Sequence, residues 1–169
     1  MSQTNYNEQD KAGLGLIADL TPYVVDSFIA ETALIYGRFV VRGADKVKQC
    51  KLPAAATDIT ARTARLGIVT ATQFIETPRN TTTAAPPQYT INKTVNVMSW
   101  GRVWVECETN TVDTTKGVFV RHTAAGALNK VGVFADAAGT GLAQITEARW
   151  MTVDQLVNGR NLAMVEIRL

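Results

Sequence analysis

The clearest pattern in the chain is an alternation of apolar and polar residues in the segment NLAMVEIRL. Ala163, Val165 and Ile167 share one parity, whereas Met164 and Glu166 share the other. Successive side chains of a β-strand point to opposite faces of a sheet. The alternation therefore predicts a strand with one face in a core.

The segment RVWVECE alternates in the same way. Val103, Val105 and Cys107 point one way, and Trp104 and Glu106 point the other. Trp104 thus lies opposite the apolar face of its own strand. It is expected either to pack in a second core or to lie at an interface, where aromatic residues are enriched.

A β-hairpin is predicted around the tripeptide Ser99–Gly101. The strand-like segments YTINKTVNVM and RVWVECE flank it, and Gly101 suits a turn position with positive φ. Further strands are predicted in GVFVRH, KVGVFAD and GLAQITEARWM. The threonines and paired prolines of RNTTTAAPPQ predict a long exposed loop at about residues 76–89.

The first half of the chain predicts three more strands. LIYGRFVV is apolar and β-rich, and its Gly37 indicates a bulge or a close backbone approach. DKVKQCKL carries Lys46, Lys48 and Lys51, a lysine density typical of a solvated edge strand or of a surface for an acidic partner. RLGIVTATQFIE is the third strand.

The segment LTPYVVDSFIAET leaves two interpretations open. Thr21 and Pro22 suit the start of a helix, but the run is short and rich in β-branched residues, which disfavour helix. We therefore expect an N-terminal arm with a possible short helix over residues 1–33 and a β-domain over residues 34–169. The fold class is mainly β: an antiparallel β-barrel or sandwich with an extended N-terminal arm and at most one or two short helices.

Charge and hydropathy exclude several classes of protein. Lys and Arg total 17 and Asp and Glu total 15, which gives a net charge of +2. Nucleic-acid and membrane-surface binders concentrate many more cations, so neither partner is expected. The polar start MSQTNYNEQDK has no apolar core typical of a signal peptide, so we expect synthesis and folding in the cytoplasm.

The residue inventory also limits the chemistry. The chain has one histidine, His122, and two cysteines, Cys50 and Cys107. Histidine-assisted nucleophiles and four-ligand zinc sites both need more than this. The loop aspartates, Asp113, Asp136 and Asp154, lack ligand-like spacing. No catalytic residue, metal or cofactor is expected.

Each of these residues also has a purely structural interpretation. His122 continues the parity of its strand, which favours a hydrogen-bonded structural histidine over a pH switch or catalytic base. Cys107 is interpreted as a small buried hydrophobe. Cys50 lies among lysines that could lower its pKa and make it reactive, although an incidental thiol is favoured.

Several segments, taken together, resemble the capsid cement (decoration) proteins of tailed bacteriophages. The N-terminal pattern is carried by Ile17-Ala18-Asp19, Pro22, Val25, Ser27, Gly37, Val40 and Gly43. VNVMSWGRVWVECE, GVFVRHTAAGALNKVGVFAD, ARWMT and NLAMVEIRL continue the match through most of residues 13–169. One departure is Ala127, where the family has a second glycine in its "TAxGG" turn.

The resemblance implies a β-rich structural protein on the outside of a phage capsid, in the virion, with no catalytic residues. It would bridge neighbouring copies of the major capsid protein and stabilise the expanded head. Its partners would be the major capsid protein and itself, as a homotrimer in preference to a dimer. The alternative is a non-enzymatic glycan-binding β-domain on a virion surface, with Trp104 or Trp150 stacked on a sugar ring.

The N-terminal arm is a candidate partner-binding element. Residues 1–12 are too polar to bury themselves in their own domain. Such arms commonly add a strand to an exposed sheet edge. Asn5 and Asn7 tolerate that setting, Tyr6 can fill a pocket, and Leu14 and Leu16 follow behind. With Trp104, these residues form the predicted contact with the capsid or a sister subunit; packing along the chain's own barrel is the alternative.

Overall fold

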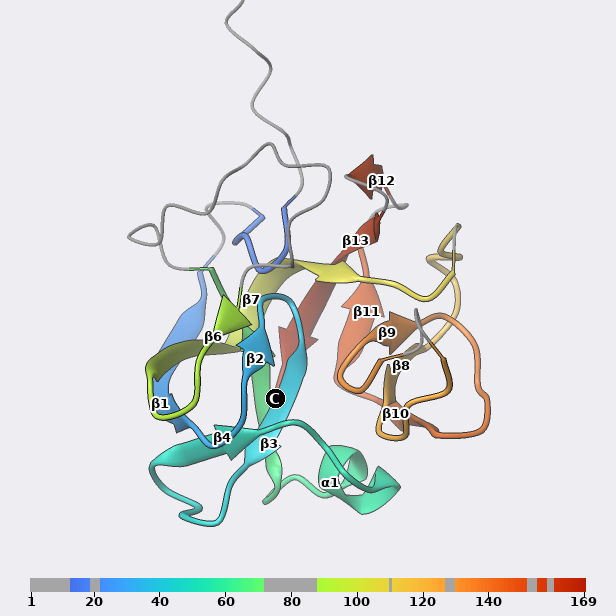
Figure 1. Cartoon of the computed structure of the whole chain (residues 1–169). Helices are drawn as coiled ribbons and strands as arrows, with labels where there is room; N and C mark the ends of the chain where they lie inside the picture. Colours follow the sequence, from blue (N-terminus) through green and yellow to red (C-terminus); the bar gives the residue numbers. More distant parts are fainter. Residues whose placement is uncertain are drawn as a thin grey trace, which may run out of the picture.

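The computed structural model describes residues 13–18, 22–71, 88–109, 111–126, 130–151, 155–157 and 160–169. Among these residues, one short helix, α1 (Ala56–Thr60), accompanies a set of mostly short strands. Figure 1 shows a barrel on the left, a small separate sheet on the right, and α1 below them. The prediction of a mainly β fold is confirmed, and of the two architectures left open, barrel or sandwich, the structure has the barrel. No helix in the described part of the chain is long and apolar enough to cross a membrane.

Five strands close the barrel. Their order is β1-β4-β3-β5-β7, and β7 pairs back with β1. β1 and β4 are parallel, and the other neighbours are antiparallel. The strands are β1 (Val24–Ala30), β3 (Phe39–Arg42), β4 (Gln49–Lys51), β5 (Arg65–Val69) and β7 (Thr94–Glu106).

The sheet continues beyond the barrel because β7 is longer than its barrel partners. Its second half pairs with β13, which in turn pairs with β11 and β12. A three-stranded sheet of order β10-β8-β9 and the pair β2–β6 complete the fold. These strands are β2 (Leu34–Ile35), β6 (Gln88–Tyr89), β8 (Val118–Arg121), β9 (Phe134–Ala135), β10 (Leu142–Ile145), β11 (Ala148–Trp150), β12 (Gln155–Val157) and β13 (Arg160–Arg168).

Two apolar cores stabilise this arrangement. All five barrel strands contribute to the first, which therefore fills the barrel interior; it includes Val40, Cys50 and Val97. The second lies between the outer side of the barrel, the β13 extension and the β8–β10 sheet, and it includes Phe134 and Val165. Burial of apolar surface on this scale is the dominant favourable term in folding.

The hairpin predicted at Ser99–Gly101 is wrong, because β7 runs through this tripeptide without reversing. Val24 pairs with Trp100 while Val25 pairs with Met98, so Ser99 is the extra residue of a β-bulge. The bulge shifts the alternation by one residue. Val97 before it faces the barrel interior, whereas Val103 after it faces the second core.

The segment left open between helix and extended chain forms strand β1. Its β-branched residues suit a pleated strand, and it has hydrogen-bonded neighbours on both edges, β4 and β7. The barrel therefore includes residues that precede residue 34. Thr21 and most of the loop expected at 76–89 lie outside the described residues.

Two strand predictions also need correction. The lysine-rich segment is not an edge strand: Lys46 and Lys48 lie in an exposed turn, and the short β4 after it is paired with β1 on one side and β3 on the other. LIYGRFVV divides into β2 and β3 at Gly37, whose φ is 72°. The close backbone approach expected there is present, since a Cβ on Gly37 would lie 3.2 Å from the backbone oxygen of Trp104.

Candidate functional site

Residues 13–18 lie along the second half of β7. The Gly15 N–H donates to the Trp104 carbonyl oxygen at 2.9 Å, and the Trp104 backbone N–H donates to the Leu16 carbonyl oxygen at 3.0 Å. The Ala18 N–H donates to the Arg102 carbonyl oxygen at 2.9 Å. β1 pairs with β7 only as far as Trp100. Residues 13–18 pair with the part of β7 beyond it, in the manner of an added strand.

The side chains of this segment build a third, small core. Leu14 and Leu16 pack with Trp104, which is 5% exposed, and with Leu162. Of the two interpretations of Trp104, packing in a core or contact at an interface, the structure supports packing in a core. The predicted partner residues Asn5, Tyr6 and Asn7 lie outside the described residues. The contact with a partner that the sequence analysis predicts for Asn5, Tyr6, Asn7, Leu14, Leu16 and Trp104 stays a prediction.

The two tryptophans proposed to stack on a sugar are both buried. Trp104 lies in the third core, and Trp150 is 4% exposed with its indole N–H donating to the Gly117 carbonyl at 3.2 Å. Neither presents a ring face to solvent. The glycan-binding interpretation therefore loses the residues on which it rested.

The exposed tryptophan is Trp100, which the sequence assigned to a turn. Register places Val24, Trp100 and Arg168 in one row across β1, β7 and β13. Val24 is 41% exposed and Trp100 is 45% exposed. Paired residues project from the same side of a sheet, so the three side chains form a continuous exposed strip.

A second row lies beside this strip. Register aligns Arg102, Glu166 and Arg149 across β7, β13 and β11, and Arg168 belongs to the same face because it contacts Glu166. We call the two rows together the Trp100 face: Val24, Trp100, Arg102, Arg149, Glu166 and Arg168. The polar parity of the alternating last strand was its visible signal in the sequence, since Glu166 and Arg168 both occupy it.

Glu166 is the centre of the second row. Its carboxylate accepts hydrogen bonds from Arg102 Nε at 2.9 Å, from Arg149 Nη2 at 3.1 Å and from Arg168 Nε at 3.0 Å. Burial raises the pKa of Glu166, but the hydrogen bonds from the three guanidiniums outweigh burial and place its pKa below the usual range. The carboxylate is therefore ionised and holds the arginines in place.

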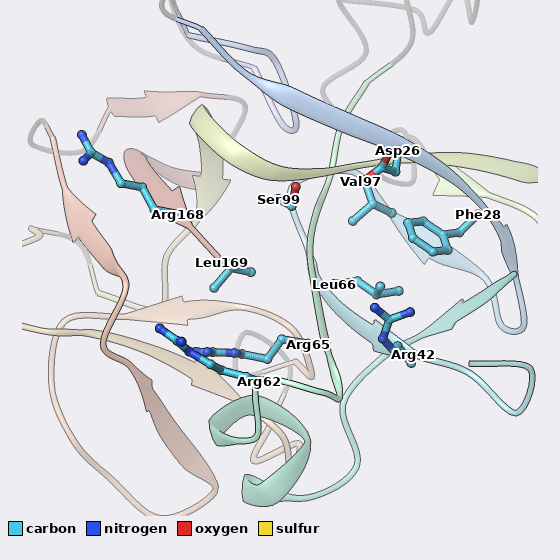
Figure 2. A pocket seen from close by; sticks show the side chains of 10 residues that line it. All are labelled: Asp26, Phe28, Arg42, Arg62, Arg65, Leu66, Val97, Ser99, Arg168 and Leu169. Atoms are coloured by element: carbon cyan, nitrogen blue, oxygen red, sulfur yellow. The ribbon is translucent and has the colours of Figure 1, made fainter. Parts of the chain in front are cut away.

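A hollow of about 450 Å³ is lined by residues of the barrel strands β1, β3, β5 and β7 and by the last two residues of the chain. Phe28, Leu66 and Val97 form its apolar side, and Arg62 and Arg65 lie next to each other across from them (Figure 2). Arg168 also lines the hollow, but it directs its guanidinium away from the other labelled side chains. The remaining lining residues are Asp26, Arg42, Ser99 and Leu169.

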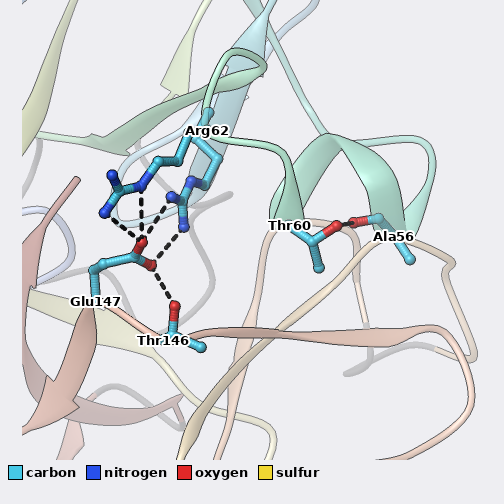
Figure 3. A network of polar contacts seen from close by, with 6 residues as sticks. Ala56, Thr60, Arg62, Thr146 and Glu147 are labelled. Carbon is cyan, nitrogen blue, oxygen red and sulfur yellow. Dashed lines mark hydrogen bonds and ion pairs between the residues drawn. The ribbon is translucent and has the colours of Figure 1, made fainter.

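The two neighbouring arginines of the hollow are held by one carboxylate. Arg65 contacts both oxygens of Glu147, at 2.7 and 3.0 Å, and Arg62 approaches it at 3.3 Å (Figure 3). The Arg65 guanidinium, with the Thr146 hydroxyl, holds the pKa of Glu147 well below its usual range. Both guanidiniums are thus engaged within the chain, so the hollow is the weaker candidate for binding a partner.

Comparison with known proteins bears on the choice between a capsid cement protein and a glycan-binding β-domain. Residues 2–168 match the family described as "Structural cement protein (E217 gp24/Pam3 gp6)", a family of phage proteins. The chain belongs to this family. The family resemblance inferred from the sequence is confirmed, and with it the role of a capsid cement protein.

The fold of this cement protein is also similar to that of a solved chain described as "The capsid of Myoviridae Phage XM1". The two align with a TM-score of 0.68 at 19% identity, over 98% of this chain and 96% of the other. At this level of identity the similarity concerns the fold alone. A comparison with curated proteins gave no match.

The reactive residues of this cement protein have structural surroundings. Cys50 is fully buried, and burial, with Glu31 nearby, raises the pKa of its thiol to about 11. The alternative of a reactive thiolate at Cys50 is therefore not supported, because burial outweighs any effect of the neighbouring lysines on the pKa of the thiol. Cys107 is buried in the second core, as predicted, and both cysteines are free.

The histidine and the aspartates also contact neighbours within the chain. His122 Nδ1 lies 3.0 Å from the Thr123 hydroxyl, and the Asp113 N–H donates to the buried Asp136 carboxylate at 3.0 Å. In the described ranges, no three His, Cys, Asp or Glu residues gather as metal ligands do. Asp154 lies outside those ranges.

Proposed function

We propose that this cement protein binds the outer surface of the phage capsid, bridges neighbouring major capsid protein subunits and stabilises the expanded head. It acts without catalysis, metal or cofactor, is made in the host cytoplasm and becomes part of the virion. The observation that carries the proposal is the Trp100 face. It exposes a tryptophan between an apolar residue and an arginine, and Trp and Arg are among the residues that dominate binding energy at protein interfaces.

Bridging needs two separate attachments, and the chain offers two. The Trp100 face is one. The other is the N-terminal arm, in which Leu14 and Leu16 pack on Trp104 and anchor the segment that follows residues 1–12. Asn5, Tyr6 and Asn7 then make the second contact. Two modest contacts on one molecule reinforce each other through effective concentration.

The attachment through Trp100 is tested by the variant Trp100→Ala. We expect its affinity for capsids assembled without the protein to fall by about 30-fold, the size typical of an interface tryptophan. Its melting temperature should change little because Trp100 is half exposed. Sedimentation of capsids with increasing amounts of protein measures the occupancy.

The matched control is Ile91→Ala, since Ile91 is 56% exposed in the turn that precedes β7. It should bind capsids as the unaltered protein does. Full occupancy by Trp100→Ala at the same concentrations would show that the Trp100 face is not an attachment surface.

The arm is tested by deletion of residues 1–12. The shortened protein should keep its melting temperature, because the segment that builds the third core begins at Gly13. It should lose capsid occupancy by about tenfold or more, because one of the two linked contacts is gone. Unchanged occupancy would contradict the proposal for Tyr6 and its neighbours, and so would a domain that no longer folds.

We propose a homotrimer on the capsid in preference to a dimer. Closed symmetric oligomers are the usual form of such assemblies. A reconstruction of decorated capsids should show three-fold symmetric density for the protein, whereas two-fold density would support the dimer. An isolated copy at a position without symmetry would contradict both.

A further inference from the structure

The arginines of the Trp100 face carry more charge than their shared carboxylate neutralises. Three guanidiniums surround Glu166, so the cluster has three positive charges and one negative charge. Register on three adjacent strands fixes Arg102, Glu166 and Arg149 in one row. An excess of two positive charges therefore lies on a rigid sheet rather than on a loop.

Two of the three guanidiniums are presented to solvent. The side chains of Arg149 and Arg168 are 63% and 65% exposed, whereas that of Glu166 is 6% exposed. Within the described part of the chain, Arg149 contacts Glu166 through Nη2 alone. Its Nε and Nη1 keep their donors available, and a guanidinium can bind a carboxylate through two parallel hydrogen bonds.

The surroundings of the cluster indicate the class of ligand. Arg168 lies directly beside Trp100 and, one strand further, Val24. An apolar strip next to two solvent-exposed guanidiniums fits a polypeptide that carries an apolar side chain close to its carboxylates. A nucleic-acid surface would instead spread many cations over a wide area, and the whole chain has a net charge of only +2.

We infer that Arg149 and Arg168 bind the carboxylates of an acidic segment of the major capsid protein, with Glu166 and Arg102 holding the pair in position. This inference rests on the proposed function and names the chemistry of the partner at the Trp100 face. Electrostatic pairing of this kind fixes register and speeds association. Trp100 adds apolar area beside it.

The test is the double variant Arg149→Gln/Arg168→Gln, added to capsids assembled without the protein. We expect its affinity to fall by about tenfold or more at physiological ionic strength. The difference from the unaltered protein should shrink as salt is raised, because salt screens the charges that were removed. The melting temperature should stay close to that of the unaltered protein, since both side chains are mostly exposed.

The control is Lys46→Gln/Lys48→Gln, which makes the same change in net charge in an exposed turn. It should bind with unchanged affinity; an equal loss would mean that only net charge matters and would overturn the inference. If the unaltered protein binds capsids and Arg149→Gln/Arg168→Gln binds them with the same affinity, the inference is overturned and the proposed function stays intact. Unaltered protein that does not bind would overturn both.

A competition experiment identifies the class of ligand. Poly-glutamate should displace the unaltered protein from capsids at concentrations where duplex DNA of the same total charge does not. Displacement by DNA as effective as that by poly-glutamate would contradict an acidic polypeptide as the partner.

Discussion

Replacement of Gly67 by alanine is expected to destabilise the barrel by about 3–5 kcal/mol. Gly67 lies in β5 with a φ of 153°, a conformation that other residues rarely adopt. A Cβ at this position would collide with the Met98 carbonyl oxygen of β7 and would lie 3.2 Å from the Ser99 Cα. Backbone atoms cannot move aside as a flexible side chain can, so β5 and β7 would have to separate where they close the barrel.

Urea unfolding of Gly67→Ala measures this loss as a lower midpoint. Gly139→Ala is the matched control, because its new methyl group would meet only the flexible end of Leu142, at 3.3 Å. We expect the control to stay within about 0.5 kcal/mol of the unaltered protein. A Gly67→Ala variant as stable as the control would show that β5 does not approach β7 in this way.

The second large effect is expected from Glu106→Ala, which should cost about 3–5 kcal/mol of stability. Glu106 at the end of β7 contacts Arg38 Nη2 at 2.6 Å, and the side chain of Arg38 is 2% exposed. Arg38 also donates to the carbonyls of Lys130 and Val131, so it joins the barrel to the β8–β9 connection. Removal of the carboxylate takes away this ion pair of the buried Arg38 guanidinium.

Thermal unfolding compares Glu106→Ala with Arg62→Ala. Arg62 also pairs with a glutamate, but its side chain is 82% exposed, and pairs of this kind contribute between about 0 and 1 kcal/mol. We expect a clear loss for the first variant and almost none for the second. Equal stability of the two variants would contradict the role of the Arg38–Glu106 pair in joining barrel and sheet.

The sequence predicted those strands in which apolar and polar residues alternate without interruption. The parities of β13 and of the second half of β7 are confirmed, since Val103 and Val165 lie in the second core while Trp104 and Leu162 lie in the third. The prediction failed where pairing with a strand far away in the sequence determines the local structure. The bulge at Ser99 exists because β1, which lies far earlier in the chain, pairs with both sides of it. No local pattern distinguishes such a bulge from a turn.

The candidate site was predictable only in part, for a similar reason. The sequence marked the tryptophans and the polar parity of the last strand, but it favoured Trp104, whereas Trp100 is the exposed one. Arg102 and Glu166 are 64 residues apart in the chain. Only the register of β7 against β13 brings them together, and that register follows from the tertiary fold.

The central claim is that this cement protein strengthens the head by linking capsid subunits from outside. The most direct test compares the heat resistance of expanded capsids assembled without the protein before and after the purified protein is added back. We predict that the added protein binds and raises the temperature at which the capsids come apart. Capsids that bind none of it, or that bind it and come apart at the same temperature, would contradict the claim.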